Sequence, residues 1–186
     1  MPHHAFIGIG TNLGHRPTNY RGAIERISRL PTTRLVKQSS CYETEPVGDI
    51  SGRFLNGVVE VETELSAQAL MNHLLHTERL MGRKRPKPGK GRSRSGPVAR
   101  VIDLDLLLFD NEVIRGPSLT VPHPRLHERR FVLAPLSELA PSLVHPVLNA
   151  TVSELLAALK PGPRVTLAHA DLLRSARPQR QEVASR

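Results

Sequence analysis

The sequence contains no tryptophan, a single cysteine and few aromatic residues, which make up 3% of its 186 residues. The single cysteine, Cys41, excludes an intrachain disulfide and is typical of a reducing compartment. Because the histidines also lack the spacing of zinc ligands, the sequence argues against a structural zinc site. No apolar run approaches the ~18 residues of a membrane span, and the opening residues, MPHHAFIGIG, lack the long apolar region of a secretory signal. We therefore expect a cytoplasmic protein with no membrane partner.

Acidic residues are missing from one long stretch of this basic chain, whose formal net charge is +9. Residues 83–100 hold eight of the 26 Lys and Arg residues and no acid, and residues 160–186 hold six basic residues against two acids. What remains of the chain has 12 basic and 15 acidic residues. Because the positive charge is confined to one loop and one tail, the chain lacks a broad basic face, and we expect no nucleic-acid partner.

Hydrophobic periodicity predicts strands and helices that alternate along one domain. The expected strands lie at residues 5–10, 33–41, 54–65 and 98–109, and the expected helices at residues 19–30 and 66–81. The order strand, helix, strand, strand, helix, strand is typical of the α+β class. It predicts a ferredoxin-like αβ sandwich, with helices on one face of a mainly antiparallel sheet and additional strands. Residues 42–53 are expected to form a mobile loop, and residues 119–141 a short helix with irregular ends.

The C-terminal part of the chain shows one clear helix start. Thr151 and Glu154 match a capping box, which predicts a last helix that ends near Lys160. We therefore expect residues 1–160 to form a single domain. Residues 161–186 are expected to be a basic C-terminal extension, with one edge strand at 164–169 followed by a disordered tail.

The run VARVIDLDLLLF, residues 98–109, places two carboxylates inside an otherwise apolar strand. Because strand side chains alternate between faces, Asp103 and Asp105 point to the same side. The alternation puts Ile102, Leu104, Leu106 and Leu108 on one face, and Val101, Asp103, Asp105, Leu107 and Phe109 on the other. Unpaired acids on a largely apolar face are costly, so a positive partner is expected: arginine, a metal ion or both. Oxygen-only ligation of this kind suits Mg²⁺.

Candidate partners for these acids come from two segments. Arg100 lies three residues before Asp103 and follows the Gly-rich basic loop, a combination that suits the binding of phosphates, although the loop is equally compatible with a solvated charge run. His123 and Arg129 share a Pro-rich connection, in which the histidine is either a phosphate ligand or a surface residue. Glu78 falls on the inward stripe of the helix at 66–81 and also requires a partner.

The few aromatic residues include two that open segments after loops. Phe54 and Phe131 are placed to sandwich a flat heterocycle, whose edge Asn56 would bind through its amide. The alternative is that both phenylalanines belong to the core.

Six motifs occur in an order and spacing that cover roughly residues 5–160: IGTNLG (9–14), YETEPVG (42–48), FLNGVVEVET (54–63), ERLMGR (78–83), RVIDLDLLLF (100–109) and LTVPHPRLHERRFVLAPL (119–136). Together they resemble the 6-hydroxymethyl-7,8-dihydropterin pyrophosphokinase family of folate biosynthesis. The resemblance implies a ferredoxin-like domain at residues 1–160 that transfers pyrophosphate from ATP to the hydroxymethyl oxygen of a reduced pterin and releases AMP. We expect the protein to be a monomer.

The resemblance also implies roles for residues at the matching positions. Asp103 and Asp105 would hold two Mg²⁺ ions together with ATP. Catalytic roles would fall to Arg83 and Arg100. Contacts with ATP would come from Arg83, Arg100, His123 and Arg129. The pterin site would be formed by Thr44, Pro46, Val47, Phe54, Asn56 and Phe131. Glu78 would have a supporting role.

Two other functions fit parts of the pattern. Two acids on a strand of a ferredoxin-like sheet also suit a nucleotidyltransferase or cyclase, which acts at an α-phosphate with two metal ions. The basic loop and tail favour an RNA-binding module, although the predicted central strands carry no exposed aromatic platform.

Overall fold

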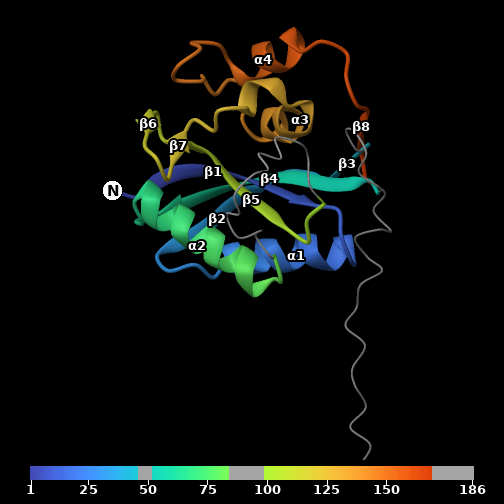
Figure 1. Ribbon diagram of the computed structural model, residues 1–186. Coiled ribbons are helices and arrows are strands. Elements are labelled where there is room, and N and C mark those ends of the chain that lie inside the picture. Colours follow the sequence, from blue (N-terminus) through green and yellow to red (C-terminus); the bar gives the residue numbers. More distant parts are fainter. Residues whose placement is uncertain (46–51, 84–98, 169–186) are drawn as a thin grey trace, which may run out of the picture.

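The computed structural model describes residues 1–45, 52–83 and 99–168 (Figure 1). Residues 84–98 of the Gly-rich basic loop and the expected tail beyond residue 168 lie outside the described residues. In chain order the elements are β1 (His3–Thr11), α1 (Arg16–Ile27), β2 (Thr33–Gln38), β3 (Tyr42–Thr44), β4 (Phe54–Thr63), α2 (Ala67–Leu80), β5 (Asp103–Phe109), β6 (Ile114–Arg115), β7 (Thr120–Val121), the 3₁₀ turn η1 (Leu126–Glu128), α3 (Arg130–Leu139), α4 (Val152–Ala158) and β8 (Val165–Leu167).

The main sheet is antiparallel at every pairing, with the strand order β5-β1-β4-β3-β8, and β2 also pairs with β4. Because β2 and β3 lie along different parts of β4, the pattern β5-β1-β4-β2 is that of a ferredoxin-like sheet. The predicted fold class is therefore confirmed.

The sequence predicts a loop over the whole of residues 42–53. This prediction is wrong for the first three residues, which form β3. These residues pair with β4 on one side and β8 on the other. A strand of three residues is too short to show a period of two, and its hydrogen bonds depend on partners elsewhere in the chain.

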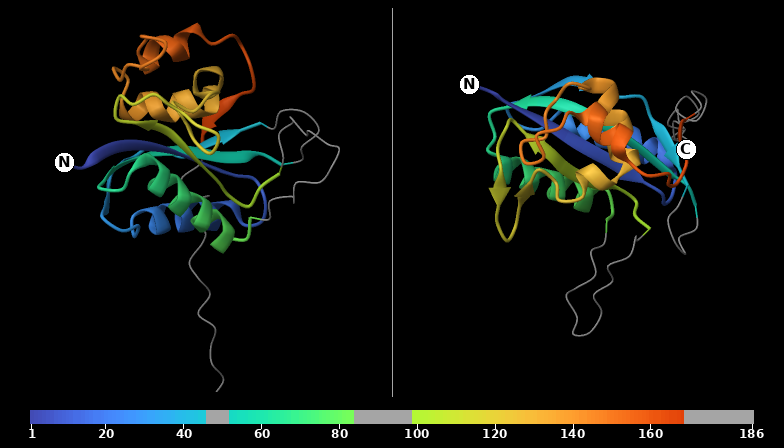
Figure 2. Two further views of the ribbon diagram at one scale, coloured as in Figure 1. Left: turned by 60° about the vertical axis from the view of Figure 1, so that its left-hand side comes forward. Right: turned by 90° about the horizontal axis from the view of Figure 1, so that it is seen from above.

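Two helical layers cover the sheet (Figure 2). On one face, α1 and α2 place Tyr20, Ala23, Leu70 and Leu74 against the odd-numbered residues of β1. On the other face, α3 and α4 cover Phe6 and part of β4 and β5. The strand-helix order predicts only the first layer. Among the described residues, we find no helix with the length and apolar content that a membrane span requires.

The pairing of β1 with β5 shifts register between Phe6 and Ile7, so that Leu107 of β5 has no partner on β1. This bulge ends the two-residue alternation. Leu108 joins the apolar cluster beneath α3, whereas Phe109 joins the cluster beneath α1 and α2. The faces predicted for these two side chains were wrong, because an inserted residue leaves no mark in the hydrophobic pattern. The two acids precede the bulge and keep their shared direction.

Gly57 of β4 lies where α1 comes closest to the sheet. A Cβ built on Gly57 would overlap the hydroxyl oxygen of Tyr20 and would lie 3.0 Å from the ring carbon Cζ and 3.2 Å from Ser39 Oγ. Tyr20 is 1% exposed, so relieving this overlap requires packed atoms to shift.

We therefore predict that Gly57→Ala lowers the free energy of unfolding by about 1–3 kcal/mol, the usual cost of overpacking a core. Urea denaturation measures this loss. Because the hydroxyl is the first atom in the way, adding Tyr20→Phe should recover part of the lost stability. A Gly57→Ala protein as stable as the parent would show that α1 does not pack this closely.

Candidate active site

The two acids of β5 lie beside a stretch of sheet that has no side chains. In the antiparallel register, Asp103 pairs with Gly10 of β1, and Gly10 pairs with Asn56 of β4. Asp105 pairs with Gly8 in the same way. A Cβ on Gly10 would lie 3.3 Å from Asn56 Oδ1, so even a methyl group would crowd this space. The carboxylates and the amide therefore share one face, with glycine backbone between them.

Two arginines from different segments share the carboxylate of Asp103. Arg83 follows α2, and its Nη1 lies 2.5 Å from Asp103 Oδ1. Arg100, which precedes β5, donates through Nη1 to Asp103 Oδ2. Each carboxylate oxygen thus faces one guanidinium group, and the structure brings together three of the predicted site residues.

Asn12 holds Arg100 in place, although the sequence indicates only a turn at this position. Its Oδ1 accepts the backbone N–H of Arg100 at 2.6 Å, and its own backbone N–H donates to the Arg100 carbonyl at 3.0 Å. Thr11 adds a bond from Oγ1 to the carbonyl of Val101 at 2.6 Å. Polar residues directly after a buried strand were the available signal, but the sequence does not reveal partners so far along the chain.

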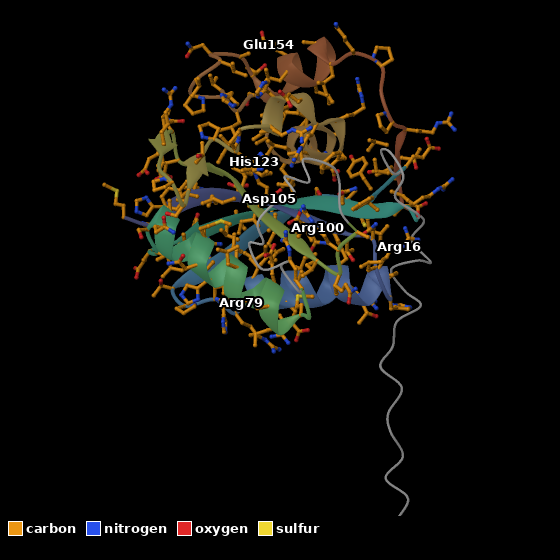
Figure 3. All side chains as sticks on the ribbon, viewed as in Figure 1. Arg16, Arg79, Arg100, Asp105, His123 and Glu154 are labelled. Carbon is orange, nitrogen blue, oxygen red and sulfur yellow. The ribbon has the colours of Figure 1, made fainter. Side chains whose placement is uncertain are left out.

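The connection after β7 brings His123 and Arg129 to Asp105. Asp105 Oδ2 lies 3.5 Å from Arg129 Nη1 and 3.8 Å from His123 Nε2. The backbone of His123 donates to the Leu107 carbonyl at 2.9 Å, which fixes this connection to the edge of β5. Figure 3 shows His123, Asp105 and Arg100 next to one another along β5, the edge strand of the sheet. A second group of predicted residues therefore meets beside the first.

Burial and charge give Asp105 and His123 opposite shifts. Burial, and then the charge of Asp103, raises the pKa of Asp105 to about 6. Burial, and then the charge of Arg129, lowers the pKa of His123 to about 4, so its ring is neutral at pH 7. Since His123 Nδ1 accepts the backbone N–H of Arg125 at 3.2 Å, its single ring hydrogen lies on Nε2, the nitrogen that faces Asp105.

Asn56 and Thr44 form a buried polar pair on the same face of the sheet as the acids. The Asn56 Nδ2 amide donates to Thr44 Oγ1 at 2.7 Å, and the two residues are 5% and 4% exposed. Phe54 is two residues before Asn56 on β4 and lies on the same face.

Phe131 lies in the first turn of α3, which belongs to the helical layer that covers this face of the sheet. Its ring lies beneath the guanidinium of Arg129, whose Cζ is 5.7 Å from the ring centroid. Arg129 therefore connects Phe131 with Asp105. The remaining two residues expected to bind pterin, Pro46 and Val47, lie outside the described residues.

The acid pair has the chemistry of a magnesium site. Asp103 and Asp105 offer carboxylate oxygens on one face, and both side chains are half-buried. Hard oxygen ligands of this kind suit Mg²⁺, which completes its shell with water and phosphate oxygens. The two carboxylates therefore fit the ion that the sequence predicts.

A second cluster of possible metal ligands lies at the other end of β1 and β5. Among the described residues, His3, Asp110 and Glu112 are the one group of three such side chains whose ligand atoms lie within 4.8 Å of one another. Asp110 already accepts from His3 Nδ1 at 2.6 Å and from the backbone of His4 at 2.7 Å. These exposed hydrogen bonds join the start of β1 to the residue that follows β5.

Comparison with known proteins gives one consistent result. Residues 6–141 match the family described as 7,8-dihydro-6-hydroxymethylpterin-pyrophosphokinase (HPPK). The 2-amino-4-hydroxy-6-hydroxymethyldihydropteridine pyrophosphokinase of Methylorubrum extorquens is 39% identical over 158 residues, which are 84% of this chain and 94% of the relative. The protein of the same name from Bacillus subtilis is 42% identical over 136 residues, which are 73% of this chain and 77% of the relative.

A solved structure, wild-type Plasmodium falciparum HPPK-DHPS with pteroate, superposes with a TM-score of 0.66 at 14% identity. The match covers 84% of this chain and 44% of that longer chain, and at this identity it shows the fold alone. The family match and the two bacterial relatives, each over most of this sequence, establish that the chain belongs to the 7,8-dihydro-6-hydroxymethylpterin-pyrophosphokinase family.

Proposed function

We propose that the two groups of side chains on this sheet face divide the pyrophosphokinase reaction between them. Family membership and the names of the relatives support pyrophosphoryl transfer to hydroxymethyldihydropterin in folate biosynthesis. In our proposal the charged group on β5 and its neighbours binds ATP, and the group around Asn56 binds the reduced pterin. The observation that carries the proposal is their common placement across the glycines of β1.

In the group proposed to bind ATP, four side chains that can donate hydrogen bonds surround the two acids. Arg83 and Arg100 contact Asp103, and Arg129 and His123 lie near Asp105. Guanidinium groups bind phosphate oxygens as they bind carboxylates, so these side chains are placed to transfer their hydrogen bonds to ATP. Neutral His123 adds a donor at Nε2 without adding positive charge.

Asp103 and Asp105 would hold Mg²⁺ with the phosphates of ATP, and we expect two ions. When bound, the metal neutralises phosphate charge and helps to align the reacting oxygens. Burial, and then the charge of Asp103, raises the pKa of Asp105, and a divalent cation would favour the ionised form of both carboxylates.

The pterin side would place a flat ring between Phe54 and Phe131. Asn56 would bind the heterocycle edge through its amide while Thr44 Oγ1 fixes the amide orientation. Pro46 and Val47 would complete this pocket.

The chemical step requires few functional groups from the protein. The hydroxymethyl oxygen of the pterin bonds to the β-phosphorus of ATP, and the bond from this phosphorus to the oxygen bridging it to the α-phosphorus breaks. AMP leaves, and the hydroxyl proton is released. The protein aligns the two oxygens and stabilises the charge on the transferred group through Arg83 and Arg100. We propose that residues 1–160 perform this reaction as one cytoplasmic domain, in the form of a monomer.

The products distinguish this reaction from the alternatives. With ATP, Mg²⁺ and 6-hydroxymethyl-7,8-dihydropterin, we predict AMP and the pterin diphosphate, separated by anion-exchange chromatography. Release of pyrophosphate with a nucleotidylated product would instead indicate a nucleotidyltransferase. Binding of polynucleotides with steep salt dependence, without any turnover of ATP, would indicate an RNA-binding protein.

We predict that Asp103→Asn and Asp105→Asn each lower kcat about 10²-fold or more, because each removes charge that the metal and the arginines require. The matched control is Asp110→Asn. Asp110 is an exposed acid just after β5, and its backbone has a positive φ that asparagine tolerates. This control should keep full activity, and circular dichroism should show all three variants folded. Full activity in either site variant would contradict the metal assignment.

Phe131→Leu should weaken pterin binding about 10-fold or more, because base-like rings stack on aromatic side chains with about 1–3 kcal/mol. Leucine keeps much of the side-chain volume in the first turn of α3. Calorimetric titration with the pterin and, separately, with a non-hydrolysable ATP analogue measures the two affinities. The affinity for the analogue should change less than the pterin affinity, because the variant removes only the contact between the Phe131 ring and Arg129 on that side. Equal pterin affinity in the variant and the parent would remove Phe131 from the pocket.

A further inference from the structure

Glu78 is a buried acid at the C-terminal end of α2, where it is 1% exposed. Its Oε1 accepts the backbone N–H of Leu104 at 2.8 Å. Leu104 is the residue between Asp103 and Asp105, and β5 is the outermost strand at this end of the sheet. The carboxylate of Glu78 therefore fixes the backbone from which both acids project.

The same oxygen also accepts from Nη1 of Arg83. The backbone brings this pair together, because α2 ends in a turn with Gly82 at φ +89°. In this turn the Arg83 N–H donates to the Glu78 carbonyl at 3.0 Å, and the Gly82 N–H donates to the Arg79 carbonyl at 3.0 Å. These two bonds define a Schellman motif, which returns Arg83 over the helical residue five positions earlier.

Arg83 is thus shared between two carboxylates. Its Nη1 contacts Glu78 Oε1 on one side and Asp103 Oδ1, at 2.5 Å, on the other. Glu78 lies behind Arg83 in the core, whereas Asp103 lies at the partly open face. If Asp103 turns to a cation, Arg83 loses one partner and keeps the other.

We propose that Glu78 is a positioning residue that keeps the Arg83 guanidinium at the acid pair while Asp103 binds a cation and its nucleotide. This inference rests on the proposed function, because it requires Asp103 to exchange Arg83 for a metal ion. A buried carboxylate is stable only when it is paired, so Glu78 and Arg83 fix each other. Without Glu78, Asp103 would be the carboxylate left to Arg83 among the described residues, and Arg83 would compete with the metal for it.

Glu78→Gln separates this role from a merely structural one. The glutamine oxygen can still accept the Leu104 N–H, but the amide carries no charge to hold Arg83. We expect kcat to fall about 10- to 100-fold, as for other residues that orient metal-site groups. Affinity for Mg²⁺ with a non-hydrolysable ATP analogue, measured by calorimetry, should fall about 10-fold.

The decisive experiment is a double-mutant cycle with Arg83→Met. If Glu78 acts through Arg83, Glu78→Gln should change kcat and analogue affinity by no more than about twofold once Arg83 is absent. The control is Arg79→Met, an exposed residue one position along the same helix, which should leave both quantities unchanged. Urea denaturation checks that each protein is folded, and Glu78→Asp replaces Glu78→Gln in the cycle if the latter does not fold.

Independent effects of Glu78→Gln and Arg83→Met would overturn the proposal, as would wild-type affinity and turnover in Glu78→Gln. The affinity cycle does not depend on turnover. If the parent protein formed no AMP but the two variants remained coupled in analogue binding, the proposed reaction would fail while the positioning role stood. AMP formation without coupling would remove the positioning role alone.

Discussion

The placement of two half-buried carboxylates on one face of one strand is the constraint to which the rest of the site responds. Asp103 and Asp105 are partly removed from water, so positive charge beside them is needed to keep both ionised. Their partners Arg83, Arg100 and Arg129 come from the end of α2, the segment before β5 and the start of α3. Three separate segments therefore meet at the acids.

Small residues in β1 lie between the acids of β5 and the polar pair of β3 and β4. Gly8 and Gly10 lie directly beside the acids, whereas Ile7 and Ile9 point to the opposite face and pack beneath α1 and α2. β1 thus supplies apolar side chains to the core on one side and, at Gly8 and Gly10, only backbone beside the acids on the other. The period of two places both sets of residues.

The sequence predicts the parts of this site that depend on local pattern. The common direction of Asp103 and Asp105 follows from alternation, and the order of elements predicts the ferredoxin-like sheet. The pattern fails at Leu108, because the bulge depends on how β1 pairs with β5. It also fails to predict the bond from Asn12 to Arg100, since two distant segments must first be folded together. The sequence predicts the types of the elements, but it leaves the tertiary contacts between them undetermined.

The contacts of Glu78 are a second example of what the sequence leaves undetermined. Its place on the inward stripe of α2 indicates that it requires a partner, and the glycine four residues later marks the helix end. Neither feature shows that the partner includes the backbone of another element. That backbone becomes adjacent only when β5 takes its place beside β1.

The outer edge of β5 has a consequence for assembly. An uncovered edge strand offers its backbone groups to any strand of another chain. Here the Leu104 N–H donates to the Glu78 carboxylate, and the Leu107 carbonyl accepts the backbone N–H of His123. A second molecule could extend the sheet through β5 only by displacing both contacts. The groups that hold the face with the acid pair therefore also protect this edge against pairing with a strand of another molecule.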